Sequence, residues 1–150
     1  MTPTVGIFIL NLAVTLFLTG LIWTVQWVHY PLFARVGAEH FSAYHHEHMR
    51  RMTAVVAVPM LLELFSAGLL LRFRPPAMST SAVWIGIGLV AVIWLSTIIL
   101  QVPCHHRLAE RYLPRDQSFL TFTNWIRTLA WTARSGLLCS VLLAMLRHLR

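Results

Sequence analysis

The chain has 150 residues, of which 57% are hydrophobic and only 11% are charged, and its mean hydropathy is +0.68. This composition is too apolar for an ordinary water-soluble domain and indicates an integral membrane protein in contact with the lipid bilayer. The formal net charge of +7 would suggest nucleic-acid binding in a soluble protein. Here the arginines flank apolar runs, so topology and anionic lipid explain them better, and no nucleic-acid partner is expected.

Four apolar runs are each long enough, at about 20 residues, to cross a bilayer as an α-helix. The sequence therefore predicts an all-α fold, in which residues 1–150 form a single four-helix transmembrane bundle. The predicted helices cover residues 5–28, 41–71, 82–113 and 118–146.

The first predicted helix carries its polar side chains on one face, within about 80° of one another at 100° per residue. These residues are Asn11, Thr15, Thr19, Gln26 and His29. Such a stripe should face the bundle interior. Pro31 is expected to end the helix near the membrane surface, because a proline ring cannot continue the hydrogen-bond ladder. The neighbouring Tyr30 fits an aromatic belt at the membrane interface.

The second predicted helix presents His45, His48 and Met52 on the side that later carries Glu63. His45 and Glu63 are 18 residues apart in the sequence, which is roughly 27 Å along a straight helix. They therefore cannot ligate the same ion, and the polar interior should contain a rim zone and a deeper zone.

The third and fourth predicted helices repeat the polar stripe at spacings of three and four residues. The third helix carries Trp94, Thr97, Gln101 and His105, and the fourth carries Asn124, Arg127, Trp131 and Arg134. Charged side chains at membrane depth are costly and usually face a bundle interior or a water-filled cavity. Four such stripes predict one shared polar interior.

Four histidines from three helices should meet at the rim: His29, His45, His48 and His105. Imidazole is the commonest biological metal ligand, so this cluster predicts a site for a transition metal (Fe, Cu or Zn) or for haem b. Two other interpretations stay open. The histidines could hydrogen-bond lipid headgroups and water at the interface, or they could sense pH.

The deeper zone should contain Glu63, Arg127 and Arg134, with Glu63 between the two arginines in depth, so that an ion pair with either is possible. One interpretation is a structural ion pair that fixes the register of two helices. However, two arginines against one glutamate leave an uncompensated positive charge in a low dielectric, which predicts an anionic ligand. In that interpretation Arg127 stabilises negative charge and Glu63 donates or accepts a proton. Arg134, Gln26, Gln101 and Trp131 are then candidates for contacting the substrate.

Residues 26–31 read QWVHYP and residues 123–127 read TNWIR. With these segments the chain resembles the anthrone-oxygenase-like group of small four-helix membrane proteins, which also have a proline at the end of the first helix and an Asn/Trp/Arg cluster on the fourth. The resemblance implies oxidation of a small aromatic or lipophilic compound, with Asn124 and Arg127 as the matching site residues. The rim histidines are more numerous than that pattern requires, which puts a cofactor-free mechanism in doubt.

The leading hypothesis is a membrane oxidoreductase or oxygenase that acts on a small lipophilic, partly anionic substrate. A small transporter or a proton or ion conduit that uses Glu63 is the first alternative, and a non-catalytic subunit of a membrane complex is the second. A chain of this size also leaves a homo-oligomer open.

The distribution of arginines predicts an orientation. Six arginines lie near the loops that follow the first and third predicted helices, against four on the opposite side. The four are Arg72, Arg74, Arg147 and Arg150. Because cytoplasmic loops are enriched in positive residues, we expect a multi-pass protein of the inner (plasma) membrane, with the histidine-rich loops in the cytoplasm and both termini outside.

Overall fold

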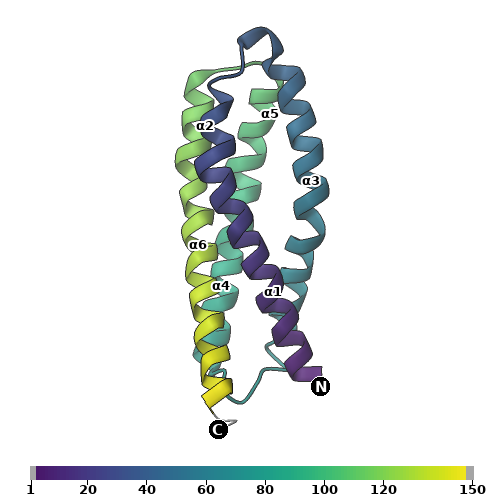
Figure 1. Cartoon of the computed structure of the whole chain (residues 1–150), viewed down its shortest axis with the longest axis vertical. Coiled ribbons are helices and arrows are strands. Elements are labelled where there is room, and N and C mark those ends of the chain that lie inside the picture. Colours follow the sequence, from purple (N-terminus) through teal and green to yellow (C-terminus); the bar gives the residue numbers. More distant parts are fainter. Residues whose placement is uncertain (1–2, 148–150) are drawn as a thin grey trace.

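The computed structural model describes residues 3–147, and Arg150 lies outside them. Within these residues four helical rods have the length and hydropathy to span a membrane, and no strand is present. The rods run alongside one another, and the first rod begins at the same end of the bundle at which the last one finishes (Figure 1). The predicted all-α, four-helix fold of a multi-pass membrane protein is confirmed.

Two of the four rods are interrupted by a π-helical turn. The first rod consists of α1 (Pro3–Thr24), η1 (Val25–His29) and α2 (Tyr30–Phe33), the second is α3 (Ala38–Leu69), the third consists of α4 (Thr80–Ser96), η2 (Thr97–Gln101) and α5 (Val102–Glu110), and the fourth is α6 (Pro114–Arg147). Apart from the end of the first rod, the predicted bounds lie within four residues of the observed ones.

Pro31 does not end the first rod, so this part of the sequence prediction is wrong. The rod continues to Phe33 because the π turn η1 comes directly before the proline. In η1 the backbone N–H of Tyr30 donates to the carbonyl of Val25, five residues back. The wider turn accommodates a proline ring that would clash with the preceding turn of a regular α-helix.

The third rod also contains a π turn, η2, directly before the residue that precedes its proline. The backbone N–H of Val102 donates to the carbonyl of Thr97, again five residues back, and Pro103 follows directly. Each of these rods therefore has a π turn, one further residue and then a proline. Both turns lie near the end of the bundle that carries α2 and α5 (Figure 1).

The bundle buries polar side chains among an apolar core, and its exterior is apolar. Large apolar side chains remain exposed on the outside, such as Phe65 with 66% and Phe122 with 77% of their surface accessible, as expected for contact with lipid. Asn11, Thr15 and Gln26 of the first rod are buried, which confirms the inward orientation of its polar stripe.

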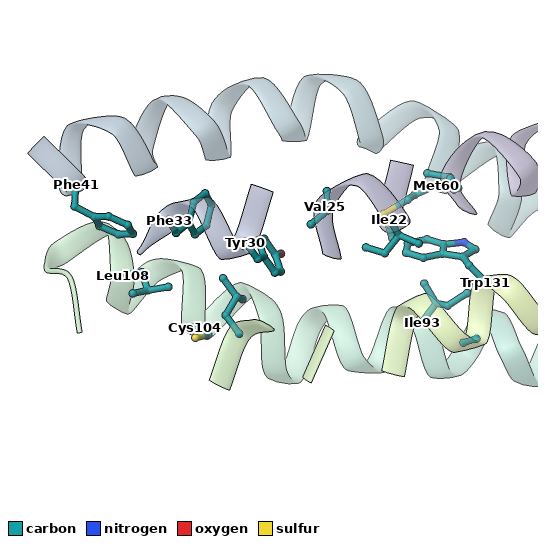
Figure 2. Close-up of a cluster of buried hydrophobic side chains, with 13 residues drawn as sticks. Ile22, Val25, Tyr30, Phe33, Phe41, Met60, Ile93, Cys104, Leu108 and Trp131 are labelled. Atoms are coloured by element: carbon teal, nitrogen blue, oxygen red, sulfur yellow. The ribbon is translucent and has the colours of Figure 1, made fainter. Parts of the chain in front are cut away.

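One cluster of buried apolar side chains extends along the axis of the bundle. Figure 2 shows Phe41 and Phe33 at one end of this cluster, Tyr30 near its middle, and Met60 and Trp131 at the other end. It therefore runs beside the rim histidines and reaches Trp131, which donates a hydrogen bond to Glu63 in the deeper zone.

Candidate functional site

The deep carboxylate pairs with one of the two deep arginines. Arg134 Nε donates to Glu63 Oε1 at 3.1 Å, and the two residues are 1% and 0% exposed. Thr15 Oγ1 donates to the same carboxylate oxygen at 2.7 Å, and Trp131 Nε1 donates to Oε2 at 3.0 Å. Both carboxylate oxygens of Glu63 thus have donors.

The rest of the Arg134 guanidinium is also bonded. Its Nη1 donates to the carbonyl of Gly86 at 2.6 Å, and its Nη2 donates to Asn11 Oδ1 at 2.8 Å. The ion pair and its partners come from α1, α3, α4 and α6. This closed network fits the structural interpretation of Glu63 and Arg134, since it fixes the register of all four rods.

Arg127 lies in a different environment. It is 9% exposed, and its guanidinium donates to Asn124 Oδ1 at 2.5 and 3.1 Å. Longer contacts reach the oxygens of Tyr30 at 3.3 Å, Thr97 at 3.4 Å and Gln101 at 3.5 Å. All of these acceptors are neutral, and among residues 3–147 no carboxylate forms an ion pair with Arg127.

The two amide side chains beside Arg127, Asn124 and Gln101, are each held in place by a further hydrogen bond. Asn124 Nδ2 donates to Gln26 Oε1 at 2.8 Å, which turns the Asn124 oxygen toward the guanidinium. Gln101 Nε2 donates to Thr123 Oγ1 at 2.8 Å and leaves its oxygen toward the same group. Arg127 is thus oriented without being neutralised.

Arg127 forms part of the wall of a cavity with a volume of about 180 Å³. The cavity lies between α3 and the other three rods, and most of its wall is apolar. Its polar side chains are Tyr30, His48, Thr53, Thr97, Gln101, His105 and Arg127. Two wall residues are exposed on the outside of the bundle: Thr53 on α3 and Val102 on α5. The cavity therefore reaches the outer surface between these two helices.

The four rim histidines do gather, as the sequence predicts. The ring centroids are 5.1 Å apart for His45 and His105, 5.9 Å for His45 and His48, 6.1 Å for His48 and His105, and 5.7 Å for His29 and His48. Phe33 packs edge-on against His45 and His48 at 5.1 and 4.8 Å. Three rods therefore contribute to one aromatic cluster.

The nitrogens of two of these histidines form a chain and do not converge on one point. His105 Nδ1 lies 3.1 Å from His45 Nε2, and His105 Nε2 lies 3.0 Å from the Tyr30 hydroxyl. In the described part of the chain, no three His, Cys, Asp or Glu side chains form a group that could hold a metal ion. As they are arranged, the rim histidines do not fit a metal or haem ligand set, and the cofactor stays a prediction.

The structure separates the predicted site residues into those that line the cavity and those that do not. Arg127, Gln101, Trp131, His48 and His105 line it. Glu63, Arg134, Asn124, Gln26, His29 and His45 lie behind the wall or beside the cavity, where they support the residues that line it.

Sequence reasoning missed Tyr30, which is 2% exposed and lines the cavity between Arg127 and His105. Tyr30 follows Gln26 by four residues, a spacing that places both side chains on one helix face. The sequence carries this signal. However, a tyrosine next to a proline near the membrane surface also fits an aromatic belt at the interface.

Comparisons with family models, with curated proteins and with solved structures find no match to this chain.

Proposed function

We propose that the cavity binds a small lipophilic molecule that carries an anionic oxygen, and that the protein acts on this molecule as a membrane oxidoreductase. The observation that carries the proposal is the buried guanidinium of Arg127, which meets only neutral acceptors. An unpaired charge in a low dielectric is costly, so a bound carboxylate, phenolate or enolate would supply the missing partner.

The size of the cavity limits the part of the ligand that is enclosed. An apolar cavity of roughly 150 Å³ can hold benzene, so the 180 Å³ here accommodates about one aromatic ring. A longer apolar chain would extend past Thr53 and Val102 into the lipid. We therefore propose a headgroup of one aromatic ring, or at most two fused rings, with an apolar tail that enters from the bilayer.

The oxidoreductase part of the proposal is supported by the chemistry of the wall and by the resemblance to anthrone-oxygenase-like proteins. Arg127 would stabilise negative charge on a ring oxygen during oxidation, and Tyr30, His48 and His105 can exchange protons with the ligand. These roles need no metal or haem, because they use only the side chains that line the cavity. We also propose the plasma membrane, with the histidine end in the cytoplasm, from the distribution of arginines.

A conduit that uses Glu63 gains no support from the geometry. The carboxylate is fully buried, accepts hydrogen bonds on both oxygens and does not line the cavity. Both oxygens are already occupied by donors from Thr15, Arg134 and Trp131, so neither is left to accept a passing proton.

The binding test uses two probes of nearly the same shape, the anionic 4-octylbenzoate and the neutral 4-octylbenzamide. Purified protein in lipid nanodiscs should bind the benzoate at least about tenfold more tightly, the equivalent of about 1.4 kcal/mol. Arg127→Gln should remove this preference and Arg127→Lys should keep part of it. Arg72→Gln is the control, because Arg72 is exposed in the turn that follows the far end of α3. Equal binding of both probes by the wild-type protein would overturn the proposal.

An absorption spectrum and elemental analysis of the same preparation test the redox part. Oxidation of a ring substrate that is lost in Arg127→Gln supports the oxidoreductase, whereas bound haem, iron or copper that is lost in His105→Ala would show that the rim histidines rearrange to hold a cofactor. If neither a cofactor nor oxidation of a ring substrate is detected while the benzoate preference holds, the protein binds the lipophilic anion but is not an oxidoreductase.

A further inference from the structure

Tyr30, His105 and His45 form a line of hydrogen-bonding side chains. The line runs from the cavity toward the end of the bundle that carries α2 and α5, which we call the loop end. Arg127 Nη2 donates to the Tyr30 hydroxyl at 3.3 Å, and this hydroxyl lies 3.0 Å from His105 Nε2. On the other side of the same ring, His105 Nδ1 lies 3.1 Å from His45 Nε2. The His105 imidazole is therefore contacted through both of its nitrogens, which is the arrangement that allows a proton to cross the ring.

The line ends at a polar atom that has no partner. His45 is fully buried, and its Nδ1 has no hydrogen bond in the structure. A histidine with a purely structural role would be expected to bond both nitrogens, because an unsatisfied buried nitrogen is costly. His45 is the eighth residue of α3, which places it about 10 Å from the start of that helix at the loop end.

We propose that Tyr30, His105 and His45 form a proton relay that exchanges protons between the ligand in the cavity and water at the loop end. This inference rests on the proposed ligand cavity and adds the path of the proton. Tyr30 touches the ligand, and the two histidines act through Tyr30.

The relay balances without a co-reactant. At the start Tyr30 donates to His105 Nε2, His105 Nδ1–H donates to His45 Nε2, and His45 carries a proton on Nδ1. When the Tyr30 oxygen takes a proton from a ligand hydroxyl, its own proton moves to His105 Nε2. The proton on His105 Nδ1 moves to His45 Nε2, and the proton on His45 Nδ1 leaves to water. Each side chain stays neutral, and the ligand is left as an anion beside Arg127.

The groups around the relay favour transfer in this direction. Arg127 is the charged group that faces Tyr30, and it would stabilise the anion that remains. His48 packs beside His45 and His105 but forms no hydrogen bond with either in the structure. Phe41 stacks on His45 at 5.2 Å, and Phe33 packs against the same ring at 5.1 Å, so apolar rings shield the line from the sides.

The test uses 2-naphthol, a photoacid that releases its hydroxyl proton when it is excited. Time-resolved emission of 2-naphthol in nanodiscs that contain the protein measures the rate at which naphtholate appears. Displacement of 2-naphthol by 4-octylbenzoate establishes that it occupies the cavity. The Tyr30→Phe variant keeps the ring and removes the hydroxyl, so the transfer rate should fall by about 100-fold while binding is retained.

Two further variants separate the relay from simple contact. His45→Gln keeps a hydrogen-bond partner for His105 but cannot pass a proton, so it should also slow transfer. Tyr44→Phe is the matched control, because Tyr44 lies on the exposed side of α3, outside the relay, and its variant should behave as the wild type. Unchanged transfer in Tyr30→Phe, with displacement intact, would overturn the relay and leave the cavity proposal standing. If 4-octylbenzoate does not displace 2-naphthol, the cavity proposal itself fails.

Discussion

Replacing Glu63 by Gln should destabilise the folded protein strongly, although the two side chains have nearly the same shape. The carboxylate is 0% exposed and accepts from Thr15, Trp131 and Arg134 at 2.7, 3.0 and 3.1 Å. The Gln side chain places an NH₂ group where one carboxylate oxygen accepted, so that a donor faces a donor. It also leaves the Arg134 charge buried without a counter-ion.

The size of the effect follows from the second of these changes. Removing one partner of a buried ion pair typically costs about 3 to 5 kcal/mol, because the remaining charge stays in a low dielectric. The bonds from Arg134 to Gly86 and Asn11 remain in the variant, so the guanidinium has no easy route to solvent. We expect a loss of about 3 kcal/mol or more in the free energy of unfolding.

Unfolding by SDS in mixed micelles, followed by tryptophan fluorescence and circular dichroism, measures this change. Glu47→Gln is the control, because Glu47 pairs with Arg50 and Arg51 on an exposed face and should matter little. The double variant Glu63→Gln/Arg134→Met should be less destabilised than the sum of the two single variants, since it removes the unpaired charge. A loss below about 1 kcal/mol for Glu63→Gln would refute the reasoning that this pair fixes the bundle.

Three further variants test other parts of the interior by the same unfolding assay. A Cβ at Gly86 would lie 2.9 Å from Arg134 Nη1, so Gly86→Ala should cost about 1 to 3 kcal/mol, and a neutral result would contradict the close approach. Trp131→Phe leaves Glu63 Oε2 without its donor and should cost about 1 to 3 kcal/mol, whereas an unchanged midpoint would show that the bond is dispensable. Arg127→Gln should raise the stability of the ligand-free protein by about 0.5 to 2 kcal/mol, because it removes an unpaired buried charge, and a fall would indicate a structural role.

The existence and the type of the four rods could be predicted from hydropathy, because a bilayer admits few structures other than helices of about 20 apolar residues. The inward faces could also be predicted, since polar residues such as Asn11 and Thr15 recur at helical spacing. The end of the first rod could not. A proline usually stops a helix, but Pro31 follows a π turn that makes room for it, and no pattern in the sequence marks such a turn.

The ion-pair partner of Glu63 could not be predicted from the spacing of residues in the sequence. Depth along the helices allowed Glu63 to pair with Arg127 or with Arg134, and the choice depends on how the rods rotate and cross. In the structure Glu63 pairs with Arg134, because Trp131 and Thr15 hold the Glu63 carboxylate toward Arg134. The gathering of the rim histidines was predictable from common depth, but the hydrogen bond that links His45 and His105 was not.

Each π turn contains one residue more than the α-helical turn that it replaces. In η1, Trp27 and Val28 are 65% and 47% exposed, so the extra residue lies on the lipid side of the helix. Deleting Val28 should therefore restore an ordinary turn and leave the flanking faces where they are. The same deletion halfway along α6 would swing every later side chain by about 100°. Length variation among descendants of this chain should accordingly concentrate at Val25–His29 and Thr97–Gln101.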